Sequence, residues 1–158
     1  MSQPKDFGFN EDISMLKETF AKFLTEKQPI NTLRPSLEGT EDPYHGATRA
    51  GFFDKDTWQQ MIQLGWHAVA VPEEQGGIGM GLVAATALAE EIGRFALPTP
   101  LSTTLQACFL LRELKSAGAD QLLSQIATGE SVGLAIYGQQ GSLNTDSTDV
   151  MHDAGTLT

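Results

Sequence analysis

The sequence of 158 residues has one cysteine, Cys108, which excludes a disulfide within the chain and a zinc site built mainly of cysteines. Long apolar runs are missing as well. The longest mostly apolar stretch, Leu82–Ala89, is far shorter than the roughly 18 residues that a membrane span needs. The first residues also lack the apolar core of a signal peptide. We therefore expect a cytoplasmic protein without a membrane span.

Basic residues are scarce too. There are 10 Lys and Arg against 20 Asp and Glu, which gives a formal net charge of −10. Nucleic acid is bound by a basic face, so this balance argues against a nucleic-acid partner. A phosphorylated small ligand stays open, because a local basic cluster can oppose the net charge. With 41% hydrophobic and 19% charged residues, the composition is that of a globular domain.

Apolar residues recur at helical spacing in several segments. The pattern predicts helices over about residues 10–27, 54–64, 82–95, 102–116 and 120–129. Asn10 and Asp54 are suitable N-caps of the first two helices, and Gly65 is a suitable stop of the second. The segment over residues 82–95 is apolar nearly all round, so we expect it in the middle of a helical bundle.

The boundaries of the last two helices rest on short local signals. Pro100 breaks the chain, and Ser102 or Thr103 is expected to cap the fourth helix. We expect Gly118 to end that helix and Asp120 to cap the fifth. Gly129 is then expected to close the fifth helix.

The character of the chain changes after residue 130. Ser131–Tyr137 is typical of a strand, residues 138–148 of a polar loop, and Val150–Thr158 of a second strand. Residues 28–53 are a long connection rich in proline and glycine. We therefore predict an all-α fold, with a helical domain over residues 1–130 and the first strands of an incomplete β-domain over residues 131–158.

Four of the six residues from Gly76 to Gly81 are glycines, and they precede a predicted helix. The arrangement is superficially similar to a dinucleotide-binding turn, but the G-x-G-x-x-G register is missing and two acids come just before it. The other interpretation is a tight loop whose glycines allow close approach of the backbone to a neighbour or a ligand. We favour the tight loop.

Other chemistry-bearing residues form no clear constellation. No histidine has a second His or Cys at the spacing of metal ligands, so we predict no metal site. Cys108 falls on an apolar helix face, where a cysteine usually belongs to the core rather than to a nucleophile pair with a distant histidine. Glu73-Glu74 and Glu90-Glu91 are interpreted as solvated or capping charges rather than as acid–base pairs.

Five short patterns, taken in order, resemble the N-terminal domain of acyl-CoA dehydrogenases. After Trp66 they are V-P-E-E-Q-G-G-I-G at 71–79, A-E-E-I-G-R at 89–94, P-T-P at 98–100, G-E at 129–130 and D-A-G-T-L-T at 153–158. The order and spacing match over roughly residues 10–137, and the last pattern is similar to a later hairpin of the family's middle domain.

The resemblance implies a FAD-dependent enzyme that removes two hydrogens from an acyl-CoA thioester and passes electrons to an electron-transfer flavoprotein. The form of the A-E-E-I-G-R and P-T-P patterns is similar to members that act on bulky acyl groups such as steroid side chains. In the family the catalytic glutamate lies in a C-terminal helical domain, so we expect no catalytic residue in this chain. By itself the chain is expected to be inactive.

The resemblance also implies two sets of binding residues. The acyl pocket is expected to be lined by Pro100, Leu101, Thr104, Leu105 and Cys108. The alternative is that these residues pack the bundle, and for Leu105 and Cys108 the two interpretations weigh the same. The flavin is expected to contact Tyr137, Gly138, Gly141 and Ser142, although the family pattern T-E-P-x-x-G-S-D survives here only in its glycine and serine.

A second hypothesis is a non-catalytic subunit or binding module of a heteromeric dehydrogenase. It is motivated by the departure of residues 137–142 from the family pattern. A third is a helical interaction domain with coincidental motifs, which the ordered matches disfavour. Under any of them, half of the helix over residues 82–95 and the unpaired strand are expected to be apolar and uncovered. We therefore expect association into a homo- or hetero-oligomer.

Overall fold

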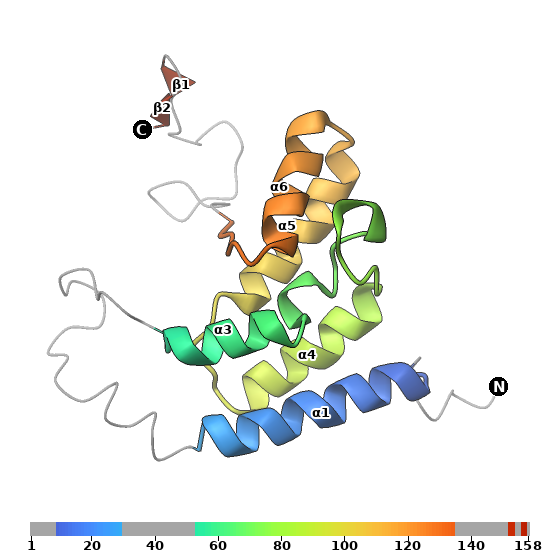
Figure 1. The fold of residues 1–158 in the computed structure, drawn as a ribbon, viewed down its shortest axis with the longest axis vertical. Coiled ribbons are helices and arrows are strands. Elements are labelled where there is room, and N and C mark those ends of the chain that lie inside the picture. Colours follow the sequence, from blue (N-terminus) through green and yellow to red (C-terminus); the bar gives the residue numbers. More distant parts are fainter. Residues whose placement is uncertain (1–8, 30–52, 135–151, 154–155, 158) are drawn as a thin grey trace, which may run out of the picture.

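The computed structural model describes residues 9–29, 53–134, 152–153 and 156–157, and these residues are mainly helical (Figure 1). The α-helices are α1 (Glu11–Lys27), α3 (Lys55–Gln63), α4 (Leu82–Arg94), α5 (Leu101–Leu114) and α6 (Ala117–Ala127). Two one-turn 3₁₀ helices, η2 (Trp66–Ala68) and η3 (Glu73–Gln75), lie between α3 and α4. The predicted all-α helical bundle is confirmed.

Helix α1 begins where the sequence predicts. The side chain of Asn10 accepts a hydrogen bond from the N–H of Ile13 at 2.9 Å, which satisfies one of the free donors of the first turn. Phe20 and Leu24 are the fully buried residues of its apolar face. That face packs along α4, and the two helices lie side by side in Figure 1.

Asp54 caps α3, also as predicted. Its carboxylate accepts hydrogen bonds from the backbone N–H of Thr57, at 2.9 Å, and from the Thr57 hydroxyl. The hydroxyl and then the backbone N–H of Thr57 hold the pKa of Asp54 below its ordinary value. A lowered pKa in the folded state means that the cap stabilises the protein at neutral pH and loses this contribution as the pH falls through the titration range of Asp54.

The predicted boundaries of α5 and α6 are wrong. Helix α5 begins at Leu101, with Pro100 rather than Ser102 or Thr103 at the cap position, and the Thr99 hydroxyl accepts the N–H of Leu101 at 3.2 Å. It ends at Leu114, where Lys115 takes a left-handed conformation with φ +44°. Ser116, rather than Asp120, then caps α6 through the N–H of Ala119. The expected stop, Gly118, therefore lies inside α6.

The predicted strand over residues 131–137 is not found in its described part, because residues 131–134 belong to neither a helix nor a strand. Residues 135–137 and the connection over residues 30–52 lie outside the described residues. Strands β1 (His152–Asp153) and β2 (Thr156–Leu157) pair antiparallel, with His152 opposite Leu157. So short a pair does not establish a β-domain, and the division at residue 130 stays a prediction.

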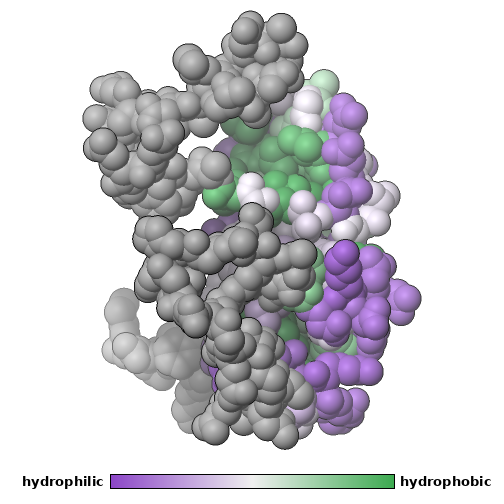
Figure 2. All heavy atoms as spheres, turned by 90° about the vertical axis from the view of Figure 1, so that its left-hand side faces the viewer, coloured by the Kyte–Doolittle hydropathy of each residue, from purple (hydrophilic) through white to green (hydrophobic). Residues whose placement is uncertain are grey.

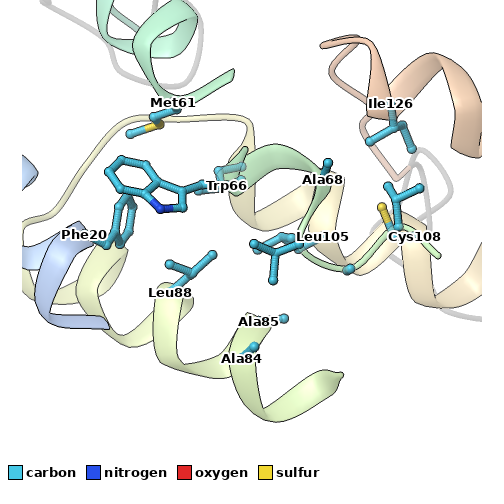
Figure 3. Packing of buried hydrophobic residues seen from close by; sticks show 14 of the residues in the cluster. Phe20, Met61, Trp66, Ala68, Ala84, Ala85, Leu88, Leu105, Cys108 and Ile126 are labelled. Atoms are coloured by element: carbon cyan, nitrogen blue, oxygen red, sulfur yellow. The ribbon is translucent and has the colours of Figure 1, made fainter. Parts of the chain in front are cut away.

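The core is centred on the indole of Trp66, which is almost fully buried. Phe20 and Phe23 of α1 meet this ring edge to face, with centroids at 4.6 and 4.9 Å. Figure 3 shows Trp66 between Phe20 and Met61, with Leu88 of α4 below. The short helix η2 thus contacts α1 through this ring and also packs against α3, α5 and α6.

Helix α4 lies between α1 and α5, as expected for the middle of a bundle, but it is buried on one side only. Leu82 and Val83 in its first turn are 64% and 39% exposed. The other large apolar residues at the surface of the described ranges are Met15, Leu64, Ile78, Leu110, Leu114 and Leu122. Figure 2 shows apolar side chains gathered on one face and hydrophilic ones along its edge. Within the described ranges, no helix is both long and apolar enough to span a membrane.

A buried carboxylate joins α1 to α4. The side chain of Glu91 is only 4% exposed, and its Oε2 lies 2.5 Å from Nη2 and 2.7 Å from Nε of Arg94. Its Oε1 lies 3.7 Å from Nζ of Lys17 on α1. The neighbouring Glu90 is 57% exposed and meets the same ammonium at 2.6 Å. The interpretation of Glu91 as a solvated charge is therefore wrong.

We expect Glu91→Gln to lower the free energy of unfolding by about 2 kcal/mol, because it removes the charge that both cations bind in a buried setting. The matched change Glu90→Gln removes an exposed pair and is expected to cost about 0.5 kcal/mol or less. Urea unfolding of both variants measures the difference. Equal losses at the two positions would contradict the role given to Glu91.

Candidate functional site

The glycine-rich loop is held by its own backbone. The N–H groups of Gly76, Gly77, Ile78 and Gly79 donate to the carbonyls of Glu73, Pro72, Ala68 and Val71, at 2.9, 3.0, 3.0 and 2.8 Å. Because these four successive donors are already paired, they cannot cradle a phosphate. Gly77 in addition lies against Val71, where a Cβ would meet the carbonyl oxygen at 2.1 Å. The interpretation as a tight loop is confirmed.

His67 is the histidine whose side chain the structure describes in full. It is buried, and its Nε2 lies 3.1 Å from the carbonyl oxygen of Ala127 at the end of α6. A carbonyl only accepts, so Nε2 carries the hydrogen and donates it. This pairing leaves His67 without the free Nε2 of a typical metal ligand. In the described part of the chain no group of His, Cys, Asp and Glu side chains is placed to hold a metal ion.

Cys108 is fully buried and belongs to the hydrophobic core cluster, which also contains Ile126 (Figure 3). Burial raises the pKa of the Cys108 thiol to about 11, so that it is protonated and unreactive at neutral pH. Its place in the core disfavours a nucleophile pair with a histidine.

We expect Cys108 to resist iodoacetamide in the folded protein at pH 7.5 and to react with one equivalent in urea, because it is the single cysteine of the sequence. Mass spectrometry of the alkylated protein measures both states. Complete labelling of the native protein at the rate of a free small thiol would contradict the buried position.

The residues expected to line the acyl pocket all lie in or just before the first half of α5. Leu101, Thr104 and Cys108 are fully buried and Leu105 is 3% exposed, whereas Pro100 is half-buried. Figure 3 shows Leu105 turned toward Ala68 and Leu88, and Cys108 turned toward Ile126. The structure therefore places Leu101, Thr104, Leu105 and Cys108 on the inner side of α5, with Pro100 just before the helix.

The surface of α5 carries other residues, which sequence reasoning did not select. Thr103 and Gln106 are exposed, and Ser102 and Phe109 are half-buried. They alternate with the buried set at the period of a helix, which is a signal present in the sequence itself. The expected flavin contacts, Tyr137, Gly138, Gly141 and Ser142, lie outside the described residues.

Comparison with known proteins identifies the family of this helical bundle. The model of the family "Acyl-CoA dehydrogenase, N-terminal domain" matches residues 10–130, which include every helix described above. The chain belongs to the acyl-CoA dehydrogenase family. The resemblance seen in the sequence is thereby confirmed.

The relatives in this family are longer proteins. The chain is 31% identical to the acyl-CoA dehydrogenase IpdE2 of Mycolicibacterium smegmatis, with 94% of this chain and 45% of the relative covered. It is 29% identical to IpdE2 of Mycobacterium tuberculosis, over 89% of this chain and 41% of that protein. It is 25% identical to the mitochondrial isovaleryl-CoA dehydrogenase of Bos taurus, over 80% and 28%. The chain thus spans less than half the length of these relatives.

A solved structure shares the fold. A variant of the Tcur3481-Tcur3483 steroid ACAD matches with a TM-score of 0.66 and 28% sequence identity. The match covers 82% of this chain and 33% of that one. The helical bundle is therefore the fold of an acyl-CoA dehydrogenase N-terminal domain.

Proposed function

We propose that the chain is the N-terminal part of a FAD-dependent acyl-CoA dehydrogenase that forms the α,β double bond of an acyl-CoA thioester. The observation that carries this proposal is the family match over residues 10–130, supported by relatives that are acyl-CoA dehydrogenases. In this account the catalytic base lies outside the 158 residues, and the flavin, when bound, accepts the hydride. An electron-transfer flavoprotein then receives the electrons, and the protein works in the cytoplasm.

In the proposal this chain supplies one wall of the acyl pocket. The first half of α5 provides it, with Pro100 as the member of the expected set that has surface left for a ligand. The buried members, Leu101, Thr104, Leu105 and Cys108, act on the pocket by fixing the position of the helix. The flavin contacts remain assigned to residues 137–142.

We further propose a bulky acyl group, such as a steroid side chain, as the substrate. This is supported by the likeness to a protein named a steroid ACAD, at 28% identity. The experiment is to incubate the protein, made from its full coding sequence, with a steroid-type and a straight-chain acyl-CoA and an electron acceptor. Mass spectrometry then follows the loss of two hydrogens. Faster reaction of the steroid-type thioester supports the proposal, and preference for the straight chain contradicts it.

A second candidate function is a non-catalytic subunit of a heteromeric dehydrogenase. It is favoured by the name of the structural neighbour, which joins two components, and by the altered pattern at residues 137–142. Exposed apolar residues such as Leu82 and Leu114 support association in either case. Co-purification with a second, flavin-bearing chain would support this candidate. A homo-oligomer with stoichiometric flavin would exclude it.

A further inference from the structure

The hydroxyl of Thr104 holds the segment that leaves the helical bundle. Thr104 is fully buried on α5, and its Oγ1 lies 3.2 Å from the backbone nitrogen and 3.4 Å from the carbonyl oxygen of Val132. One hydroxyl accepts from the N–H and donates to the C=O of the same residue. It therefore occupies both backbone groups of Val132, as a neighbouring strand would.

Two further contacts fasten the same segment to other elements. The Nε2–H of His67 on η2 donates to the carbonyl of Ala127 at 3.1 Å. Gly129, with φ +110°, lies so close to α3 that a Cβ there would meet Ile62 side-chain carbons at 3.1 and 3.2 Å. Residues 127–132 are thus held by η2, α3 and α5 in turn, and Val132 packs against the core.

The chemistry of Thr104 fits this attachment. An aliphatic side chain of the same size would leave the half-buried N–H of Val132 without the acceptor that it has now, and an unpaired donor in such a setting is costly. The single hydrogen of the hydroxyl is already donated to the carbonyl of Val132, so a ligand that needs a donor there would have to displace that contact. The two hydrogen bonds explain why a polar residue is placed among Leu101, Leu105 and Cys108 on the buried side of the helix.

We propose that Thr104 is a positioning residue, which together with His67 fixes the path of the chain out of the helical bundle. This inference rests on the proposed function, in which residues that follow Val132 along the chain contact the flavin. Thr104 then acts on the cofactor through the backbone of Val132, without touching the acyl group.

The test compares Thr104→Val, which removes the hydroxyl at constant size, with Thr104→Ser, which keeps it. Both are made in the protein expressed from its full coding sequence. We expect the amide of Val132 to exchange its hydrogen about tenfold faster in the valine variant, and near the wild-type rate in the serine variant. FAD is expected to bind several-fold more weakly in the valine variant, with recovery in the serine variant.

Other results overturn the proposal. Unchanged exchange at Val132 in the valine variant does so, as does a rise in KM for acyl-CoA with FAD affinity unchanged, which would make Thr104 an acyl-pocket residue. If the valine variant does not fold, Thr104→Cys takes its place, because a thiol of similar size is a weak hydrogen-bonding group. A wild-type protein that binds no FAD would overturn the proposed function, while the exchange rates of Val132 would still decide the role of Thr104.

Discussion

Gly77→Ala is expected to destabilise the helical domain by about 3 kcal/mol or more, because the new methyl group has no space. A Cβ at Gly77 would lie 2.1 Å from the carbonyl oxygen and 2.4 Å from the Cβ of Val71. The obstructing atoms belong mainly to backbone, so relief requires the chain to move. Such a movement would disturb the hydrogen bonds from Ile78 to Ala68 and from Gly79 to Val71.

The same substitution at Gly93 is the matched control. Gly93 lies inside α4, is exposed, and a Cβ there would meet no described atom within 4 Å. Gly93→Ala is therefore expected to stabilise the domain by about 0.5–1 kcal/mol through the helix propensity of alanine. Thermal unfolding of both variants measures the contrast. A Gly77→Ala protein as stable as the wild type would show that the loop does not pack against Val71.

Trp66→Ala is expected to cost about 3–5 kcal/mol, since it empties the centre of the core. The indole contacts Phe20 and Phe23 of α1 edge to face, so its loss also separates α1 from η2. Near-ultraviolet circular dichroism and urea unfolding of the variant measure the loss. We expect a lower urea midpoint and aromatic signals that fall by more than the loss of one indole explains.

Two further variants serve as controls for Trp66→Ala. Trp66→Phe keeps a ring in the core and is expected to cost less than the alanine variant. Leu64→Ala, two residues away at a position that is 51% exposed, is expected to change stability by about 0.5 kcal/mol or less. If Leu64→Ala and Trp66→Ala cost the same, Trp66 is not the centre of the core.

The helices could be predicted from the sequence where their signals are local. Asn10 and Asp54 cap α1 and α3 through side-chain hydrogen bonds to residues three positions on, and this spacing is visible in the sequence. The end of α5 differs from the prediction because the helix stops before Lys115, a residue that rarely takes a positive φ, rather than at Gly118. Helix α6 contains Gly118 and is capped by Ser116. The sequence offers Asp120 as an equally suitable cap, so it does not decide between the two.

The tertiary properties of the site could not be read from the chain. The burial of Glu91 depends on Lys17, which is far away in the sequence and reaches it only when α1 packs on α4. The role of Thr104 depends likewise on Val132, 28 residues later. The family was nevertheless predictable, because its patterns around Pro72–Gly79 and Glu90–Arg94 are contiguous and shape the loop and helix themselves.

Anaerobic titration of the protein, expressed from its full coding sequence, with a steroid-type acyl-CoA shows whether it is an acyl-CoA dehydrogenase. We expect a protein that carries bound FAD, whose visible absorbance is bleached by the thioester as the substrate is oxidised. The claim of an acyl-CoA dehydrogenase would be contradicted by a protein that carries FAD and keeps its full absorbance with every acyl-CoA offered. A protein that purifies without flavin and without a flavin-bearing partner would contradict it as well.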